Sequence, residues 1–319
     1  MGKFVFVMAA VILFSGTSLA ESDESFAGFD GTNLFYRSWE SKNPQAVMVV
    51  VHGFGEHSGR YEEMASMLTE NGFNVYTMDL RGHGRSDGER WNPDSFDDYI
   101  KDLKIFMDLV KEKEENRDVF LLGHSLGGEI VLKYAILYPE DIKGVIASSP
   151  SVGTYLSLPV IGRSAVSVGI LRLTTPVMGL LARIAPSLHV TGTQIDPQYL
   201  NHDRENYEAY ANDPLVCHEP MKLRFSYEAS KNILFLQEHA DELKIPCLIM
   251  YGTSDVIVPP DSIREFYGKV NSEDKKLYSF DGYYHEIFNE VGKEAVYKVL
   301  FSWLTSMVPK GMSEQAETE

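Results

Sequence analysis

Short runs of aliphatic and β-branched residues alternate along the chain with longer segments in which apolar residues recur at helical spacing. This alternation is typical of an α/β protein, in which a mostly parallel sheet is covered by helices on both faces. Because the runs are nearly continuous in apolar character, we expect their strands to be buried. The predicted strands are residues 46–52, 74–79, 119–123, 144–148, 246–252 and 276–280.

Two further segments carry clear local signals. Ser95 precedes a helical pattern that runs from Phe96 to Val110, and serine is well suited to cap the first turn of such a helix. Residues 28–39 hold Asp30 and Gly31 between apolar stretches, which predicts an antiparallel hairpin ahead of the sheet. We expect both segments to be scaffold.

The alternation of strands and helices breaks at residues 151–216, and we interpret this part as an inserted helical cap. Between Tyr155 and Val190 it is rich in apolar residues and carries three arginines but no acidic residue. The whole chain has a formal net charge of −17, so a long apolar segment with only positive charge stands out. This composition favours a surface for acyl chains or for the anionic face of a membrane. An ordinary buried helix pair is the alternative, since an apolar cap helix must bury one face whatever it binds.

The remaining residues form one domain around this insertion. The chain has 319 residues, which suits a single catalytic domain with an insertion, and its 44% hydrophobic content can build a core. We assign residues 21–150 and 217–310 to the core of the domain. The small, polar and acidic segment 311–319 predicts a disordered tail.

The N-terminal residues predict export. Lys3 precedes an apolar stretch from Phe4 to Phe14, and Ser18 and Ala20 are small residues where a signal peptidase reads them. We therefore expect residues 1–20 to be a signal peptide cleaved after Ala20, which places the protein in the periplasm or outside the cell. An uncleaved membrane anchor is the alternative, although the stretch is at the short limit for a span.

Charge and cysteine content exclude two classes of partner. A formal net charge of −17 repels phosphate backbones, so we expect no nucleic acid. Cys217 and Cys247 are the only cysteines, too few for a disulfide framework and without the paired spacing of a zinc site. Because Cys247 lies in a predicted buried strand, we expect a free thiol there.

The strongest signal for chemistry is the sequence Gly-His-Ser-Leu-Gly at residues 123–127. An apolar strand precedes it and a helical pattern follows, as in the sharp turn that presents the nucleophilic serine of α/β-hydrolases. The strained backbone of such a turn needs small neighbours, and Gly123 and Gly127 meet this need. We expect Ser125 to be the nucleophile.

A serine hydroxyl is a weak nucleophile and needs a histidine base that a carboxylate holds in place. In this fold the acid and then the histidine follow the serine, and His285 is the only histidine after the fifth predicted strand. Asp255 comes directly after that strand and is the expected acid. Asp261, Asp274 and Asp281 remain alternatives.

Acyl transfer also needs backbone N–H donors for the developing oxyanion, each worth about 2–4 kcal/mol. Leu126 directly follows the nucleophile and is the first expected donor, and Phe54, which two glycines flank, is the second. The nearby His52, His57 and His83 lack the spacing of a metal site, so we expect them to brace loops. We expect no metal and no cofactor.

Together these segments resemble one group of α/β-hydrolases. The motifs that carry the resemblance are HGFGEHSGRY at 52–61, DLRGHGRS at 79–86, the turn around Ser125, NDPL at 212–215, GTSD at 252–255, VP at 258–259 and YHEIFNE at 284–290. Over most of the chain after the leader, the sequence is similar to the monoacylglycerol lipase and lysophospholipase group, within the serine aminopeptidase S33-like hydrolases.

The resemblance implies a carboxylic ester hydrolase with the α/β-hydrolase fold. It implies hydrolysis of a monoacylglycerol or lysophospholipid through an acyl-enzyme, with the cap around the acyl chain. Peripheral membrane contact through that cap is an expectation from its composition. The leader departs from many relatives, which lack one. Fold alone does not fix the substrate, so a small-ester carboxylesterase, a thioesterase and an acyltransferase remain alternatives. A non-catalytic binding protein of the same fold is a further alternative.

Overall fold

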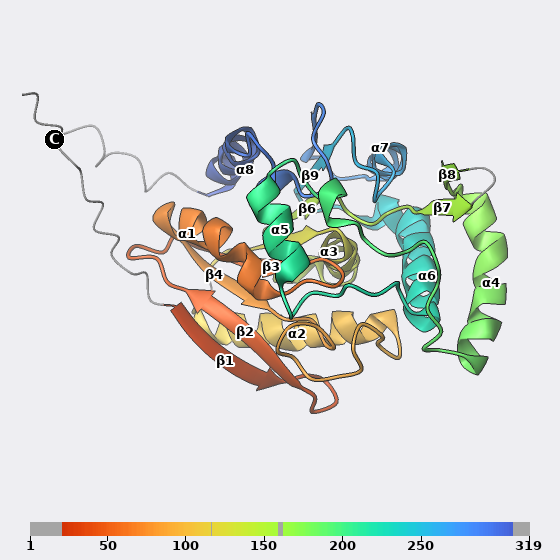
Figure 1. The fold of residues 1–319 in the computed structure, drawn as a ribbon. Helices are drawn as coiled ribbons and strands as arrows, with labels where there is room; N and C mark the ends of the chain where they lie inside the picture. Colours follow the sequence, from red (N-terminus) through yellow and green to blue (C-terminus); the bar gives the residue numbers. More distant parts are fainter. Residues whose placement is uncertain (1–20, 116, 159–161, 309–319) are drawn as a thin grey trace, which may run out of the picture.

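The computed structural model describes residues 21–115, 117–158 and 162–308, so the predicted leader and the predicted tail lie outside the described residues. An eight-stranded sheet forms its centre, in the order β1-β2-β4-β3-β5-β6-β9-β10 (Figure 1). β2 is antiparallel to both of its neighbours, β1 and β4, and the six strands from β4 to β10 in this order run parallel to one another. The strands are β1 (Glu21–Ala27), β2 (Asn33–Trp39), β3 (Ala46–Val51), β4 (Phe73–Met78), β5 (Val119–His124), β6 (Gly144–Ser148), β9 (Cys247–Gly252) and β10 (Lys275–Phe280).

All six predicted strands are present, with bounds close to the predicted ones, and the leading hairpin is longer than predicted. Every residue of β3, β4, β5, β6 and β9 is buried, as expected. The expectation of burial is wrong for β10, whose residues are partly or fully exposed. This strand lies at the edge of the sheet with β9 as its one neighbour, and its sequence begins with two lysines.

Helices cover both faces of the sheet because successive side chains of a buried strand point to opposite sides. In β3, Val47, Val49 and Val51 face a core shared with α2, α3, α6 and α7, whereas Met48 and Val50 face a second core shared with α1 and α8. The helices are α1 (Glu62–Glu70), α2 (Phe96–Lys113), α3 (Leu126–Leu137), α6 (Leu223–His239), α7 (Pro260–Lys269) and α8 (Glu294–Met307).

The sequence predicts that Ser95 caps the first turn of α2, and the structure confirms this. The Ser95 side chain accepts a hydrogen bond from the Asp97 N–H, and the Asp98 side chain accepts one from the Ser95 N–H. These two bonds satisfy donors that the first turn of a helix leaves without partners. The apolar positions of the predicted pattern are buried in the core.

Between β6 and α6 the chain forms a small hairpin, β7 (Tyr155–Leu158) with β8 (Gly162–Ala165), followed by α4 (Val168–Ile184), the short helix η3 (Pro197–Tyr199) and α5 (Arg204–Asn212). In Figure 1, α4 lies at the outer side of α6, away from the sheet. α4 packs on α6 through small residues: a Cβ atom at Gly179 would lie 2.6 Å from the Tyr227 ring. The two helices therefore approach closely along one face of α4.

The opposite face of α4 is apolar and open to solvent, and so is Leu188 in the segment that follows the helix. Leu173 and Ile184 are 78% and 75% exposed. The other exposed apolar residues of this face are Ile170, Val177, Leu180 and Leu181. The helix pair therefore exists, but it leaves most of the large apolar side chains of α4 uncovered, with Leu171 as a buried exception. No helix in the described ranges is long and apolar enough to cross a membrane.

Both cysteines are free and buried. Burial raises the pKa of the Cys217 thiol to about 11 and that of Cys247 to about 12, so both are neutral near pH 7. The expected free thiol in β9 is confirmed.

Candidate active site

Ser125 lies on a sharp turn between β5 and α3, with a backbone φ of +53° and ψ of −114°. A φ in this left-handed region is costly for a residue with a side chain and persists where the surroundings enforce it. The neighbours are closely packed: a Cβ atom at Gly123 would lie 2.2 Å from the Gly127 carbonyl oxygen, and one at Gly127 would lie 2.0 Å from that of Val51. Both positions therefore require glycine, as the sequence predicts.

Asp255 and His285 meet beyond the ends of β9 and β10. The His285 Nδ1 lies 2.7 Å from the Asp255 Oδ2, and each residue is 2% exposed. The other Asp255 oxygen accepts hydrogen bonds from the Ile257 and Val258 N–H groups, at 2.7 and 2.9 Å, which fix the carboxylate. The Ser149 hydroxyl donates to the His285 carbonyl and holds this loop against the end of β6.

The three alternative acids lie elsewhere. Asp261 pairs with Arg264 on α7, and Asp281 accepts a hydrogen bond from the Thr253 hydroxyl. Asp274 lies in the turn before β10, where its main-chain carbonyl accepts a hydrogen bond from the Cys247 N–H. The structure therefore brings Asp255, rather than these residues, to His285.

The surroundings of His285 favour its protonated form. Burial lowers the pKa of His285, but the charge of Asp255 and the hydrogen bond to it raise it by more, so the pKa lies above its ordinary value of 6.5. The buried carboxylates of Glu286 and Glu56 act in the same direction. The His124 ring lies 4.8 Å from the His285 ring, and burial lowers the pKa of His124 to about 4, so His124 is neutral.

Ser125 and His285 line one cavity of about 230 Å³. In this conformation, no hydrogen bond joins the Ser125 hydroxyl to His285 within the described residues. The cavity also has a wall from the core and a roof from the cap. These residues are Gly53, Phe54, Glu56, His124, Ile195, Leu200, Tyr210 and Glu286.

The loop after β3 places the Phe54 N–H at this cavity. The His52 Nδ1–H donates to the Gly53 carbonyl at 2.7 Å, while its Nε2 accepts from the Leu80 N–H. The Gly53 N–H donates to Glu56 at 2.5 Å. Neither the Phe54 nor the Leu126 N–H has an acceptor among the described residues, so both remain available to a ligand.

The two other histidines also make loop contacts, His57 between this loop and the cap and His83 within its own loop. The His57 Nε2 lies 2.8 Å from Asp213 of the cap, and the His83 Nδ1 lies 3.1 Å from the Arg81 carbonyl. The prediction that these side chains, with His52, brace loops is confirmed.

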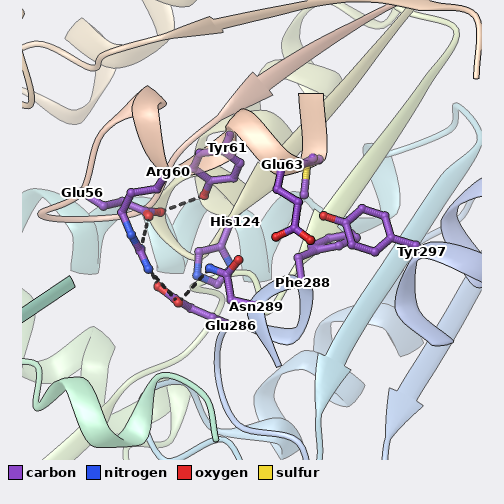
Figure 2. Close-up of a pocket in the computed structure, with 10 residues that line it drawn as sticks. Glu56, Arg60, Tyr61, Glu63, His124, Glu286, Phe288, Asn289 and Tyr297 are labelled. Atoms are coloured by element: carbon purple, nitrogen blue, oxygen red, sulfur yellow. Dashed lines mark hydrogen bonds and ion pairs between the residues drawn. The ribbon is translucent and has the colours of Figure 1, made fainter. Parts of the chain in front are cut away.

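A second cavity, of about 380 Å³, adjoins the first, sharing Glu56, His124 and Glu286 with it (Figure 2). The Arg60 guanidinium lies between two carboxylates, 2.5 Å from Glu56 and 2.6 Å from Glu286. Burial raises the pKa of Glu286, but Arg60 lowers it by more, to about 2. Both carboxylates are therefore charged near neutral pH, and the cluster has a net negative charge.

Tyr210 of α5 lines the first cavity from the cap side and lies against Arg60, which lines the second. Its ring lies 4.7 Å from the Arg60 guanidinium carbon. Its hydroxyl is buried without a hydrogen-bond partner among the described residues. No role could be predicted from the sequence for Tyr210, Arg60 or Glu286, although Arg60 lies in the motif at 52–61, Glu286 in that at 284–290 and Tyr210 two residues before that at 212–215.

The strand order, the turn at Ser125, and the placement of an acid after β9 and a histidine after β10 together define an α/β-hydrolase. Comparison with protein-family models agrees, since the family described as serine aminopeptidase, S33 matches residues 42–292. The chain therefore belongs to this family of α/β-hydrolases.

Individual relatives cover nearly the whole described chain. A monoacylglycerol lipase of Mycolicibacterium smegmatis is 30% identical over 91% of this chain and 99% of its own. The rat monoglyceride lipase is 32% identical over 82% of each chain. The crystal structure of a Paleococcus ferrophilus monoacylglycerol lipase has a TM-score of 0.73 and 31% identity, over 86% of this chain and 99% of its own.

The packing at the turn predicts that Gly127→Ala strongly destabilises the protein. The added methyl group must displace the Val51 carbonyl, and such overpacking should lower the free energy of unfolding by about 3 kcal/mol. Urea denaturation followed by circular dichroism measures this change. Gly268→Ala in α7 is the matched control, because its Cβ atom would meet nothing within 4 Å. Equal midpoints for the two variants would contradict the close packing.

Proposed function

We propose that this protein is a serine hydrolase that cleaves carboxylic esters of single-chain lipids, with Ser125 as nucleophile, His285 as base and Asp255 as the partner of the base. The observation that carries the proposal is the buried His285–Asp255 hydrogen bond in the cavity that also holds the strained Ser125. The family and the lipase relatives support the same reaction class.

In this mechanism, the Ser125 Oγ attacks the ester carbonyl carbon while the His285 Nε2 takes its proton. Asp255 holds the Nδ1–H and stabilises the imidazolium that forms. The Phe54 and Leu126 N–H groups bind the oxyanion. The alcohol leaves with the proton from His285, and a water molecule, activated by His285, then cleaves the acyl-enzyme and restores Ser125.

The missing hydrogen bond between Ser125 and His285 is compatible with this mechanism, because catalytic hydrogen bonds are often loose without substrate and tighten in the complex. His285 is already held by Asp255 and Ser149. The Ser125 side chain lines the same cavity as His285 and can rotate about its Cα–Cβ bond. We therefore expect the final contact to form when an ester binds.

Charge supports a neutral alcohol as the leaving group. The second cavity, which adjoins the one that holds Ser125, is lined by Glu56, Glu63 and Glu286, with Arg60 as the one cation among its lining residues. A phosphate group there would meet net negative charge at short range. The unpartnered Tyr210 hydroxyl can instead bond to a neutral hydroxyl group. Both features favour a monoacylglycerol over a lysophospholipid.

The exposed face of α4 supports peripheral contact with a lipid surface. It presents large apolar side chains in a contiguous stripe, and α4 has no acidic residue. Arg172 and Arg183 lie on the same helix, which suits an anionic surface. This contact would bring the cap, and the cavity under it, to membrane-dissolved substrate.

Export remains part of the proposal. Cleavage after Ala20 would leave the hairpin whole, because β1 begins at Glu21. The mature chain would then meet its substrate on the outer side of the cytoplasmic membrane.

Ester hydrolysis should depend on Ser125 and on the alcohol. We expect Ser125→Ala to lower kcat by roughly 10⁶-fold, while Ser306→Ala, an exposed serine of α8, should have no effect. The assay compares p-nitrophenyl esters and monoacylglycerols of increasing acyl length, and one acyl chain on glycerol and on glycerophosphate. Faster turnover of longer chains on glycerol is expected. Full activity of Ser125→Ala would refute the mechanism, and a short-chain optimum would favour the small-ester carboxylesterase.

Asp255→Asn should change both rate and pH dependence. Loss of the carboxylate removes the charge that raises the pKa of His285, so the acid limb of kcat/KM should move to lower pH. The amide also favours the wrong tautomer, and kcat should fall by about 10⁴-fold. Asp281→Asn is the control and should keep the wild-type profile. The reverse result would make Asp281 the acid.

The α4 face predicts binding to vesicles of phosphatidylcholine and phosphatidylglycerol. Changing both Leu173 and Ile184 to Glu should reduce this binding at least tenfold, since each apolar side chain contributes roughly 1.5–3 kcal/mol when buried. Hydrolysis of a soluble short-chain ester should not change. The control is Ile105→Glu, which changes an exposed apolar residue on α2, distant in sequence from α4. Undiminished sedimentation of the double variant with vesicles would exclude this face as the contact.

A further inference from the structure

The loop that carries His285 continues into a segment that holds the cap. After His285 the chain forms the short helix η5 (Ile287–Asn289) and reaches Glu290. The cap segment Leu200–His202, between η3 and α5, lies against it. The Glu286 N–H donates to the Leu200 carbonyl at 2.7 Å, and the Asn201 side chain donates to the Glu286 carboxylate at 3.0 Å.

The Glu290 carboxylate joins these two segments most tightly. Its Oε1 accepts from the His202 N–H at 2.8 Å and from the Val291 N–H at 2.9 Å. Its Oε2 lies 2.9 Å from the His202 Nδ1 and accepts from the Tyr284 N–H at 3.1 Å. Glu290 is 2% exposed, so these four nitrogen donors replace the water that it loses.

Tyr284 immediately precedes His285, and the cap covers it. The His202 and Tyr284 rings stack with centroids 3.9 Å apart and planes 29° apart. The Glu290 carboxylate thus holds the main chain of Tyr284, next to the proposed base. It also holds His202, the cap residue whose ring stacks on Tyr284. A displacement of His202 would therefore change the contacts of Tyr284, which is one residue from His285.

The same cap segment roofs the catalytic cavity. Leu200 lines the cavity that holds Ser125, and it directly precedes Asn201 and His202. The enclosed space in this cavity has room for about one water molecule, whereas most ligand pockets measure roughly 300–1,000 Å³. The roof must therefore open for a long-chain ester to enter, and the Glu290 contacts lie where the Leu200–His202 segment would dock again over it.

We infer that Glu290 is a positioning residue that couples docking of the cap segment Leu200–His202 to the alignment of His285. This inference rests on the proposed role of His285 as the base. With the cap docked, Glu290 fixes the Tyr284 main chain and the histidine can hold its bond to Asp255. With the cap lifted, Glu290 loses two of its four donors, and the loop before His285 is less constrained. The base is therefore aligned when the cap is docked over bound substrate.

Glu290→Gln tests this role with almost no change in shape. One oxygen becomes an NH₂ group, which must face an N–H donor in either orientation of the amide. We expect kcat to fall about tenfold with KM little changed, because misalignment affects the reacting geometry more than binding. The acid limb of kcat/KM should move to lower pH, since a looser bond to Asp255 lowers the pKa of His285.

His202→Phe tests the cap side and has a matched control. Phenylalanine keeps a ring to stack on Tyr284 but removes the Nδ1 donor to Glu290. On α6, His239 stacks on Phe235 with centroids 4.4 Å apart and bonds through Nδ1 to Glu242 at 2.8 Å. His239→Phe therefore removes the same kind of contact far from the cap segment. His202→Phe should lower kcat and shift the acid limb in the same direction as Glu290→Gln, and His239→Phe should do neither.

Thermal unfolding and the rate of labelling by a fluorophosphonate complete the test. If Glu290→Gln does not fold, the comparison of His202→Phe with His239→Phe decides. Wild-type kcat and an unshifted acid limb in both folded variants would overturn the inference while the proposed function stands. A wild-type protein that neither hydrolyses esters nor reacts with the fluorophosphonate would instead overturn the proposed function.

Discussion

The arrangement of this active site depends on how closely three backbone segments approach at the end of the sheet. The end of β5, the start of α3 and the end of β3 pack so closely that Gly127 has no room for a side chain. This packing holds Ser125 in a left-handed conformation. That packing aims the first turn of α3 at the cavity and leaves the Leu126 N–H without an acceptor. The loops after β3, β9 and β10 end at the same edge of the sheet, so each can deliver one group to Ser125.

A second constraint is electrostatic. Burying Glu56, Arg60 and Glu286 together removes three ions from water, and ion pairs of this kind rarely add net stability over apolar packing. Their value is geometric. Glu56 holds the Gly53 N–H of the loop that carries Phe54, Glu286 follows the base, and Arg60 joins the two carboxylates. The cluster thereby fixes the distance between loops that meet only in the folded protein.

The features that could be predicted from the sequence are those with a local signal. The buried strands have continuous apolar runs, the turn at Ser125 has its two glycines, and Ser95 has the character of a helix cap. His285 and Asp255 could be predicted because the chain order of an α/β-hydrolase leaves few candidates and Asp255 directly follows a predicted strand. The observed hydrogen bond then distinguishes Asp255 from the alternative Asp281. The exposure of β10 was missed because its place at the edge depends on the order of all the strands. Arg60 with Glu286, and Tyr210 with Arg60, are contacts between distant segments, and composition gives no sign of them.

The uneven distribution of charge has a consequence for how the molecule approaches a surface. The chain carries a formal net charge of −17, yet α4 has arginines and no acidic residue, beside its uncovered apolar face. The negative charge of the molecule is therefore concentrated outside α4. If the proposed contact with an anionic bilayer occurs, the acidic body would be repelled more strongly than α4, and this difference would turn the protein before contact. Long-range electrostatics would then set the orientation, and the apolar side chains of α4 would act only at contact.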